Sequence, residues 1–294
     1  MLVIFTALIS GSSIFINSFG VKGIDSTVFT FLKNIIVSIF LFAIILGFRE
    51  IKNIKKLQGK DWVSLIIIGL IGGSIPFVLF FRGLQLTSGA GGSFIHKTMF
   101  VVVAILAIIF LKEKITKKAF IPACLLLIGS FVLLKVNSFE FNDGALLVAI
   151  ATIFWAVENV ISKHVLKTIE PKVLAFGRLF FGSFFVLIFM LVTKKISLVY
   201  SLNFQQFSWI AISTPFLLLY VITWYTGLKH IKVTTATSIL LLGSPVTSLL
   251  SYLFLGTELS LMQALGMLLT VVGTILMILF LEKKPYSEPI ISTA

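Results

Sequence analysis

The sequence predicts an all-α membrane protein in which ten transmembrane helices form two inverted repeats of five helices each. Two observations lead to this fold: apolar segments of membrane-spanning length, and two halves that carry the same markers. Hydrophobic residues make up 58% of the chain and charged residues only 12%, too few to cover a soluble domain. A bilayer core of about 30 Å needs about 20 apolar residues per helix. The segments of this kind lie at residues 2–20, 26–48, 62–81, 88–111, 119–136, 145–166, 173–193, 208–228, 234–255 and 262–281.

The two halves match at a nearly constant spacing. The matched pairs lie 144 or 145 positions apart and are Lys33 and Arg178, Glu113 and Glu258, Gly83-Leu84 and Gly227-Leu228, and Gly129 and Gly273. Because each half has an odd number of spans, the second half enters the bilayer from the opposite side, and such repeats can open alternately to either face. We therefore expect a first repeat at residues 1–137, a second at residues 144–282 and a disordered cytoplasmic tail at residues 283–294.

The basic residues predict the orientation in the membrane. The net charge of +13 comes from Lys and Arg clusters between the apolar segments, and short cytoplasmic loops retain such residues. With the N-terminus inside, sixteen Lys and Arg residues fall in inner loops and the tail, and five fall in outer loops. We expect a multi-pass protein of the plasma or inner membrane with both termini cytoplasmic. The clusters lack the interleaved aromatic residues of a nucleic-acid surface, so no nucleic-acid partner is expected.

No cofactor or metal site is expected from the sequence. Its one cysteine, Cys124, rules out an intramolecular disulfide and a multi-cysteine metal site. The three His residues are scattered, and no His-Glu-x-x-His motif occurs. The Gly-rich segment at residues 88–93 lacks the Gly-Lys-Ser/Thr of an ATP-binding loop. If the two repeats move a substrate across the membrane, the energy is therefore expected from the substrate gradient or from a coupled ion.

Short motifs recur in the same order in both halves. A basic residue, Lys33 or Arg178, lies early in the second span of each half. A short acidic turn follows the fourth span, as FLKE at residues 110–113 and FLGTE at residues 254–258, and a fifth span with an internal Gly comes next. In this order the halves resemble two copies of the EamA-type unit of the drug/metabolite transporter superfamily. The resemblance implies ten helices, alternating access and export of small organic metabolites, often amino acids or related compounds. Two departures are Lys33, where the family commonly has Arg, and the aromatic Trp of the first helix, which survives only as Trp155 in the second half.

Ionisable side chains inside the spans mark the candidate binding site. A charge deep in the bilayer costs at least about 2.5–3.5 kcal/mol, so such a residue is a functional candidate by default. The residues of this kind are Lys33, His96, Lys97, Glu158 and Arg178. Helix rise puts Lys33, His96 and Lys97 roughly 10–14 Å below the outer surface, and Glu158 and Arg178 roughly 9–12 Å above the inner surface. A substrate carboxylate that meets Lys97 in an apolar cavity would be strongly favoured.

Each of these residues also has a structural interpretation. Lys33 and Arg178 lie close enough to helix ends to snorkel toward the headgroups or to bind carbonyls. Glu158 either pairs with Arg178 or faces the cavity and exchanges protons, by analogy with the membrane-embedded glutamate in the first helix of the small multidrug resistance family. His96 and Lys97 point about 100° apart on a helix, and we expect Lys97 to face the cavity.

Uncharged residues complete the candidate site. Pro76 and Pro245 interrupt helices and free backbone carbonyls that a cavity or a neighbouring side chain must satisfy. Pro245, with Ser244 beside it, is the better hinge or binding candidate. The predicted substrate-binding residues are Lys97, His96, Lys33, Trp155, Glu158, Asn159, Arg178, Ser244 and Pro245, with Glu158 also the predicted proton-coupling residue.

These observations favour a secondary transporter that exports a small anionic or zwitterionic metabolite, such as an amino-acid-like compound, by alternating access. Its partners are the small-molecule substrate and the lipid bilayer; a single chain is expected to suffice, with a dimer as an alternative. The alternative function is a polytopic membrane enzyme acting on lipid or prenyl substrates. Such an enzyme needs a concentrated acid, metal or nucleophile site, whereas Glu158 is the one acid expected inside a span. A membrane scaffold without transport would explain neither the repeats nor the charges.

Overall fold

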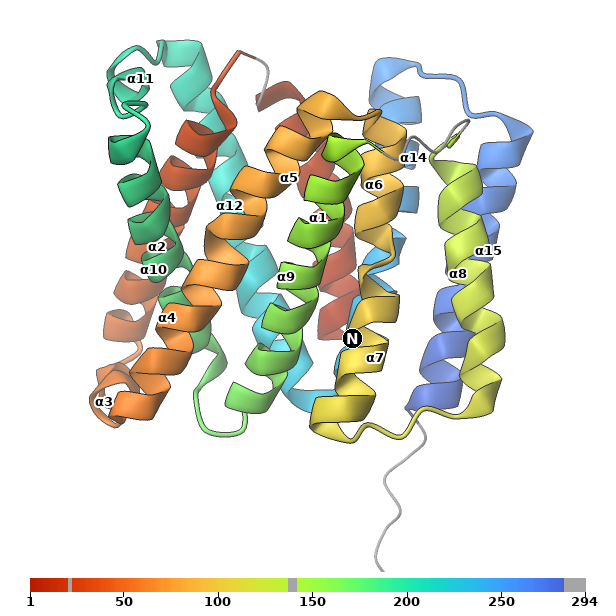
Figure 1. The fold of residues 1–294 in the computed structure, drawn as a ribbon, viewed down its shortest axis with the longest axis horizontal. Helices are drawn as coiled ribbons and strands as arrows, with labels where there is room; N and C mark the ends of the chain where they lie inside the picture. The colour runs from red at the N-terminus through yellow and green to blue at the C-terminus, as the bar shows by residue number, and fades with distance from the viewer. Residues whose placement is uncertain (21–22, 137–141, 283–294) are drawn as a thin grey trace, which may run out of the picture.

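The computed structural model describes residues 1–20, 23–136 and 142–282. These residues form helices joined by loops, and none of them lies in a strand. The long helices cross the molecule side by side, as Figure 1 shows. The predicted tail at residues 283–294 and residue 137, the end of the predicted first repeat, lie outside the described residues.

The helices follow the predicted apolar segments along the chain. Those of the first half are α1 (Leu2–Gly20), α2 (Ser26–Gly47), α3 (Ile51–Lys55), α4 (Gly59–Gly73), α5 (Ile75–Leu86), α6 (Gly89–Lys97), α7 (Met99–Leu111) and α8 (Phe120–Leu133), with the 3-10 turn η1 (Lys117–Ala119) before α8. Those of the second half are α9 (Asp143–Val165), α10 (Pro171–Val192), α11 (Ser197–Tyr200), α12 (Phe204–His230), α13 (Val233–Ile239), α14 (Gly243–Leu255) and α15 (Leu261–Leu281), with the 3-10 turn η2 (Leu240–Leu242) between α13 and α14.

Nine helical segments within the described residues are long and apolar enough to cross a membrane. Three of these segments join helices across an interruption: α4 with α5, α6 with α7, and α13 with α14. The remaining predicted span, residues 119–136, forms α8, whose 14 residues are fewer than the about 20 that a helix needs to cross a membrane. Segments of membrane length in the described chain are therefore one fewer than predicted.

The interruptions are partly explained by proline. Ser74 separates α4 from α5 with φ −135° and ψ −75°, and Pro76 follows directly in α5. The turn η2 precedes Pro245 in α14. Both sites agree with the predicted proline interruptions. The interruption at Thr98, between α6 and α7, has no proline and was not predicted.

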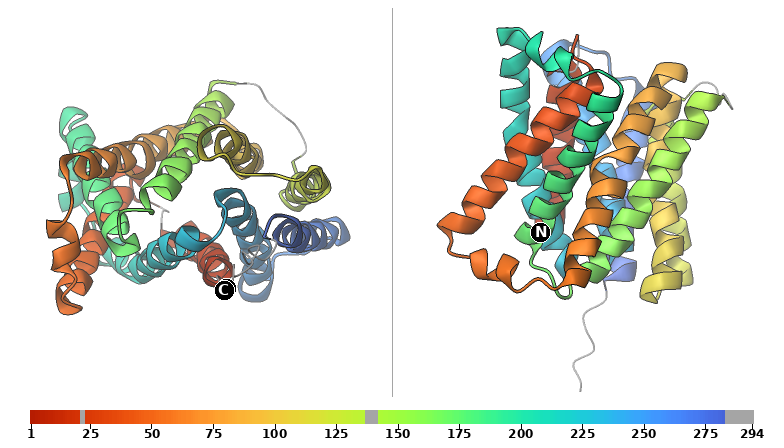
Figure 2. Two further views of the ribbon diagram at one scale, coloured as in Figure 1. Left: turned by 90° about the horizontal axis from the view of Figure 1, so that it is seen from below. Right: turned by 60° about the vertical axis from the view of Figure 1, so that its left-hand side comes forward.

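The helices pack mainly against helices of the other half of the chain. α2 lies along α10, and α8 lies along α15 at one edge of the bundle, as Figure 2 shows. Beside the first pair, α4 also packs on α10 and α12 packs on α2. In the centre, α5 and α7 pack on α9, while α12 and α14 pack on α1. The two halves are therefore interleaved, and residues distant in sequence meet in the interior.

Asp25 ties one end of the bundle together. Its carboxylate accepts hydrogen bonds from the backbone N–H groups of Thr27 and Val28 and so caps α2. It also accepts a hydrogen bond from Lys195 Nζ at 2.7 Å, which links α2 to the loop after α10. Burial raises the pKa of Asp25, but the hydrogen bonds from Lys195 and Thr27 outweigh burial and lower this pKa from its ordinary value. The carboxylate is therefore charged at neutral pH, where the link is intact.

Two glycines allow α4 and α10 to approach closely. A Cβ atom on Gly182 would lie 2.8 Å from the Cα atom of Gly73, and one on Gly73 would lie 2.6 Å from the carbonyl oxygen of Arg178. These obstacles are backbone atoms, which cannot turn aside as a side chain can. Any larger residue must push the two helices apart.

We expect Gly182→Ala to destabilise the protein by about 1–3 kcal/mol, as overpacking of a tight interior does. Thermal unfolding of the detergent-solubilised protein measures this loss as a lower Tm. Gly47→Ala is the matched control, because no atom lies within 4 Å of a Cβ at Gly47 and Ala favours helix over Gly. Equal Tm values for Gly182→Ala and Gly47→Ala would contradict the tight contact.

Candidate functional site

The interruption between α4 and α5 leaves two backbone carbonyls in need of partners. Pro76 has no N–H for the carbonyl of Gly72 one turn earlier. The N–H of Phe77 donates to Ser74 O instead of to Gly73 O. A buried carbonyl without a partner costs free energy comparable to a lost hydrogen bond. Side chains from three other helices provide the missing donors.

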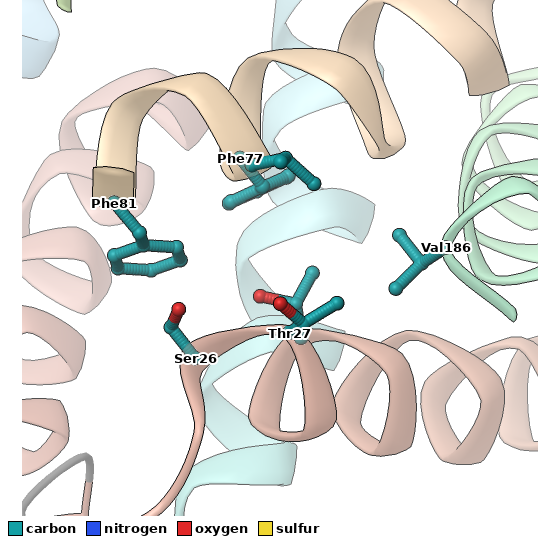
Figure 3. A pocket seen from close by; sticks show the side chains of 7 residues that line it. Ser26, Thr27, Phe77, Phe81 and Val186 are labelled. Atoms are coloured by element: carbon teal, nitrogen blue, oxygen red, sulfur yellow. The ribbon is translucent and has the colours of Figure 1, made fainter. Parts of the chain in front are cut away.

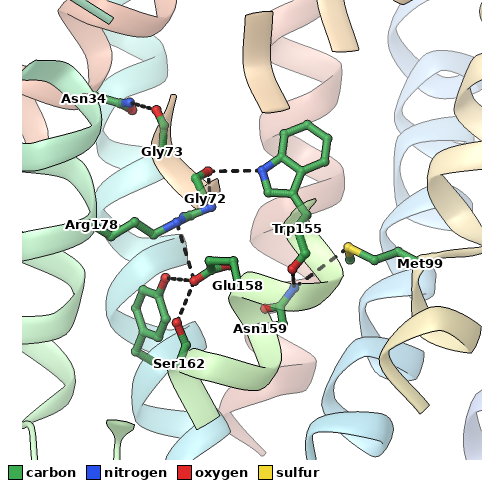
Figure 4. Close-up of polar contacts among 10 residues, drawn as sticks. Asn34, Gly72, Gly73, Met99, Trp155, Glu158, Asn159, Ser162 and Arg178 are labelled. Carbon is green, nitrogen blue, oxygen red and sulfur yellow. Dashed lines mark hydrogen bonds and ion pairs between the residues drawn. The ribbon is translucent and has the colours of Figure 1, made fainter. Parts of the chain in front are cut away.

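These donors converge on the interruption from α2, α9 and α10. Trp155 Nε1 and Arg178 Nη2 both donate to the Gly72 carbonyl, each at 3.1 Å. Asn34 Nδ2 donates to the Gly73 carbonyl at 3.1 Å. Figure 4 shows the three side chains around the two carbonyls, and all three are buried. Four helices are thus joined at one point by polar contacts.

Glu158 lies next to this junction on α9 and is 2% exposed. Its Oε1 atom accepts hydrogen bonds from the Tyr225 hydroxyl at 2.8 Å and from the Ser162 hydroxyl at 2.6 Å. Arg178 Nε lies 3.8 Å from the same oxygen, within ion-pair distance, but makes no hydrogen bond. The carboxylate therefore has one cation near it and two neutral donors bonded to it (Figure 4).

This arrangement combines the two interpretations of Glu158 drawn from the sequence. Arg178 is close enough to offset the charge of the carboxylate, as the pairing interpretation expects. Its guanidinium, however, hydrogen-bonds the Gly72 carbonyl, whereas a tight Arg–carboxylate pair commonly has two parallel hydrogen bonds. A hydroxyl group can donate or accept, so Tyr225 and Ser162 suit either protonation state of the carboxyl group.

His96 and Lys97 end α6, directly before the interruption at Thr98. The His96 ring contacts the rings of Phe80 and Trp155 at centroid distances of 5.3 and 4.9 Å. Its buried Nδ1 atom has no hydrogen-bond partner within the described part of the chain. The Lys97 side chain is half-buried and forms no hydrogen bond or ion pair with any described residue. A cation and an unpaired nitrogen therefore lie side by side in the chain without protein partners.

Lys33 joins α1 to α2. Its Nζ atom donates to Asn17 Oδ1 at 3.0 Å and lies 4.9 Å from the centroid of the Phe29 ring, a cation–π contact. The side chain is buried. Lys33 is therefore bound by protein groups, in contrast to Lys97.

Asn159, Ser244 and Pro245 lie at contacts between helices. Asn159 Nδ2 donates to the Trp155 carbonyl at 2.8 Å and contacts the Met99 sulfur at 3.8 Å. Ser244 and Pro245 open α14 and are buried, where α14 packs on α1. Hydrogen bonds, an ion pair and ring contacts thus link part of the predicted set, namely His96, Trp155, Glu158, Asn159 and Arg178.

Three residues of this network were not predicted from the sequence. Ser162 lies one helical turn after Glu158, and this spacing places the two side chains next to each other on the helix, so their contact could have been predicted. Asn34 directly follows Lys33 inside a span, where a polar side chain is unusual. Tyr225 carries no comparable signal, because a single Tyr on an apolar helix is ordinary and its contact with Glu158 spans 67 positions.

A narrow crevice, too tight to hold a water molecule, lies between α2, α5 and α10, and Figure 3 shows it from close by. Its lining combines three hydroxyl side chains with apolar ones: Ser26, Thr27, Thr30, Phe77, Val78, Phe81 and Val186. None of the predicted binding residues belongs to this lining. The crevice is therefore distinct from the polar junction at Gly72.

Sequence comparisons link the chain to transporters. The model of the EamA-like transporter family matches residues 1–135 and 142–279. A Bacillus subtilis (strain 168) protein named uncharacterized transporter YyaM is 28% identical over 240 residues, which cover 79% of this chain and 78% of that protein. An uncharacterized transporter of Archaeoglobus fulgidus is 22% identical over 282 residues, which cover 94% of this chain and 96% of that protein.

A solved crystal structure has a similar fold. It matches with a TM-score of 0.80 over 95% of this chain and 96% of its own, at 19% sequence identity. Identity this low supports the fold and leaves the substrate to be argued from the site. The resemblance inferred from the sequence motifs is confirmed, because the family model covers both halves of the chain. The chain belongs to the EamA-like transporter family.

Proposed function

We propose that the protein is a secondary transporter that exports a small anionic or zwitterionic, amino-acid-like metabolite by alternating access. The family and the names of the relatives support transport and favour it over an enzyme acting on lipid or prenyl substrates. The main support for a negatively charged group on the substrate is Lys97. This cation lies inside a span and has no acidic or carbonyl partner among the described residues. One chain suffices in this proposal, because all candidate residues belong to it.

The chemistry around Lys97 favours a carboxylate. A charge in a membrane span costs at least about 2.5–3.5 kcal/mol, and a substrate carboxylate would offset this cost through a charge-assisted hydrogen bond. The Nδ1 atom of the adjacent His96 is buried without a partner among the described residues, and we propose that it gives the substrate a second polar contact, about 100° around the helix from Lys97. The rings of Phe80 and Trp155 that contact His96 provide apolar surface for the rest of the substrate.

Several features support two inverted repeats of five spans, with α8 as the fifth span of the first. The packing is reciprocal: α4 packs on α10 as α12 packs on α2, and α5 packs on α9 as α12 packs on α1. Left-handed backbone recurs at matched positions, at Arg49 and Lys194 and at Lys112 and Gly256. The short helices α3 and α11, which follow the second span of each half, lie at opposite ends of the bundle in Figure 1.

We assign the end of the bundle that carries α3 to the cytoplasm, in the plasma or inner membrane. The loops at this end hold most of the Lys and Arg residues, including those of residues 49–60 and 112–118, as the positive-inside rule requires. The start of α1 and the end of α15 lie toward the same end in Figure 1. Both termini are cytoplasmic in this assignment.

This topology predicts the side from which engineered thiols react. In a chain with Cys124→Ala, Lys56→Cys should react with an impermeant thiol reagent only from the cytoplasmic side, and Ser201→Cys only from outside. Both positions are exposed, and they lie in loops at the α3 and α11 ends. Labelling of intact cells and of inverted vesicles measures the two sides separately. Reaction of both thiols from one side would rule out the inverted arrangement.

Lys97→Gln should lose at least about 90% of transport while the protein is still made and folded, because the substrate carboxylate loses its charge partner. Lys97→Arg should keep part of the activity, since the guanidinium keeps the charge but has another shape. Export of a pool of isotopically labelled amino acids from vesicles, read by mass spectrometry, measures the effect. Lys33→Gln is the comparison: Asn17 loses its donor, so we expect less folded protein. Transport by Lys97→Gln at the wild-type rate would remove Lys97 from the site.

We further propose that Glu158 couples export to protons. It is the acid deepest inside the described spans, and its partners Tyr225 and Ser162 suit both protonation states. Arg178 lies within 3.8 Å but hydrogen-bonds elsewhere, so loss of the carboxylate charge breaks no hydrogen bond of the guanidinium. These contacts make a change of protonation at Glu158 compatible with the folded bundle.

Glu158→Gln should therefore abolish accumulation driven by a pH gradient but leave exchange of substrate between the two sides intact. Ser162→Ala is the matched control, because it removes one hydrogen bond to the carboxylate and keeps the group that takes up the proton. Vesicles with and without an imposed pH gradient, loaded with the same amino-acid pool, measure both activities. A folded Glu158→Gln protein with unchanged dependence on the gradient would exclude coupling through this residue.

A further inference from the structure

The two acidic turns at matched positions of the halves differ in what they bind. Glu113, directly after α7, reaches the start of α13 in the other half. Its Oε1 atom accepts a hydrogen bond from the Val233 N–H at 2.8 Å, and its Oε2 atom accepts one from the Thr234 hydroxyl at 2.9 Å. Glu258, its counterpart after α14, is exposed and forms no hydrogen bond or ion pair with the described residues.

The packing of the helices follows the same asymmetry. α7 packs against α13 beside Glu113. The corresponding helices, α14 and α6, have no comparable packing among the described residues. Lys232, directly before α13, strengthens the first contact because its Nζ atom donates to the carbonyls of Lys114 and Leu281 at 3.1 and 2.8 Å. Of the two matched acidic turns, the one with Glu113 therefore links the halves, and the one with Glu258 makes no such link among the described residues.

The start of α6 has free donors where Glu258 would be needed. α6 begins at Gly89 and α13 at Val233, at matched positions 144 apart. The Ser88 side chain accepts from the N–H of Gly91, and the N–H groups of Gly89 and Ala90 have no partner among the described residues. They correspond to the N–H groups of Val233 and Thr234, which Glu113 accepts from at 2.8 and 3.4 Å.

We propose that Glu113 and Glu258 are reciprocal gating residues. In the state described here, Glu113 binds the start of α13 and keeps the inner end closed. In the other state, the contact of Glu113 is broken, Glu258 binds the start of α6, and the outer end is closed. This inference rests on the proposed function, because reciprocal closure needs two inverted repeats. The turn before Glu258 holds one residue more than the turn before Glu113, which adds to its reach.

A carboxylate suits this role for a physical reason. The first N–H groups of a helix carry partial positive charge and have no partner within the helix, so a carboxylate binds them through charge-assisted hydrogen bonds. Exchanging the inner contact for the outer one replaces the two backbone bonds of Glu113 with two equivalent ones of Glu258, which lowers the cost of moving between two discrete positions.

The test measures access to Thr235, which is fully buried on α13 beside the Glu113 contact. In purified protein with Cys124→Ala, Thr235→Cys should react slowly with a charged thiol reagent. Glu113→Gln should raise this rate at least about tenfold, since the inner contact loses its charge. Glu170→Gln is the control, because its partner Lys229 lies on the same side in an exposed ion pair, and it should leave the rate unchanged. An unchanged rate in folded Glu113→Gln protein overturns the proposal.

Two further variants separate gating from simple loosening. Thr274→Cys, buried on α15, should stay protected in Glu113→Gln; reaction of both thiols overturns the proposal. Adding Glu258→Gln to Glu113→Gln removes the competing contact, so Thr235→Cys should react several-fold more slowly than with Glu113→Gln alone. An equal rate excludes Glu258 as the counterpart. These measurements need no substrate, so thiol changes without amino-acid transport would contradict the proposed function and support the gate.

Discussion

A backbone carbonyl released at a helix interruption must find a donor inside the protein, because the membrane interior offers none. The interruption between α4 and α5 releases the carbonyls of Gly72 and Gly73, and much of the polar interior is arranged around them. Trp155 and Arg178 share the first, and Asn34 binds the second. These bonds fix the side-chain orientations of three helices. They also require α4 and α10 to lie close together, which the small residues at their contact permit.

The same constraint determines the surroundings of Glu158. Arg178 donates its hydrogen bond to a carbonyl, so the carboxylate receives its hydrogen bonds from Tyr225 and Ser162 and has the guanidinium only as a nearby charge. A guanidinium that donated two parallel hydrogen bonds to the carboxylate would instead favour its ionised form. Here Arg178 keeps its hydrogen bond to the Gly72 carbonyl whether Glu158 is charged or neutral.

Much of the fold could be predicted because a helix that crosses a membrane needs a long apolar segment, which can be recognised in the sequence. Apolar length marks the spans, and the scarcity of charge inside them singles out Lys33, Lys97, Glu158 and Arg178. The pairing of Glu158 with Arg178 was among the interpretations of the sequence, but a partner from a distant helix such as Tyr225, which meets Glu158 across 67 positions, could not be predicted. Apolar content also says nothing about the interruption at Thr98, where no proline marks the site, or about the shortness of α8.

The two halves differ at the position that builds the polar junction. Pro76 begins a new helix, whereas α12, which occupies the matched place, contains Pro215 and continues unbroken from Phe204 to His230. In α12 no described side chain donates to the carbonyl of Ala211, one turn before Pro215, and the hydroxyls of Ser213 and Thr214 bond the carbonyl of Ile210 in their own helix. The interruption at Pro76 thus draws Trp155 and Arg178 of the second half to a carbonyl of the first half. The described part of α12 has no matching junction, so the polar contacts around Gly72 break the similarity of the two halves at this point.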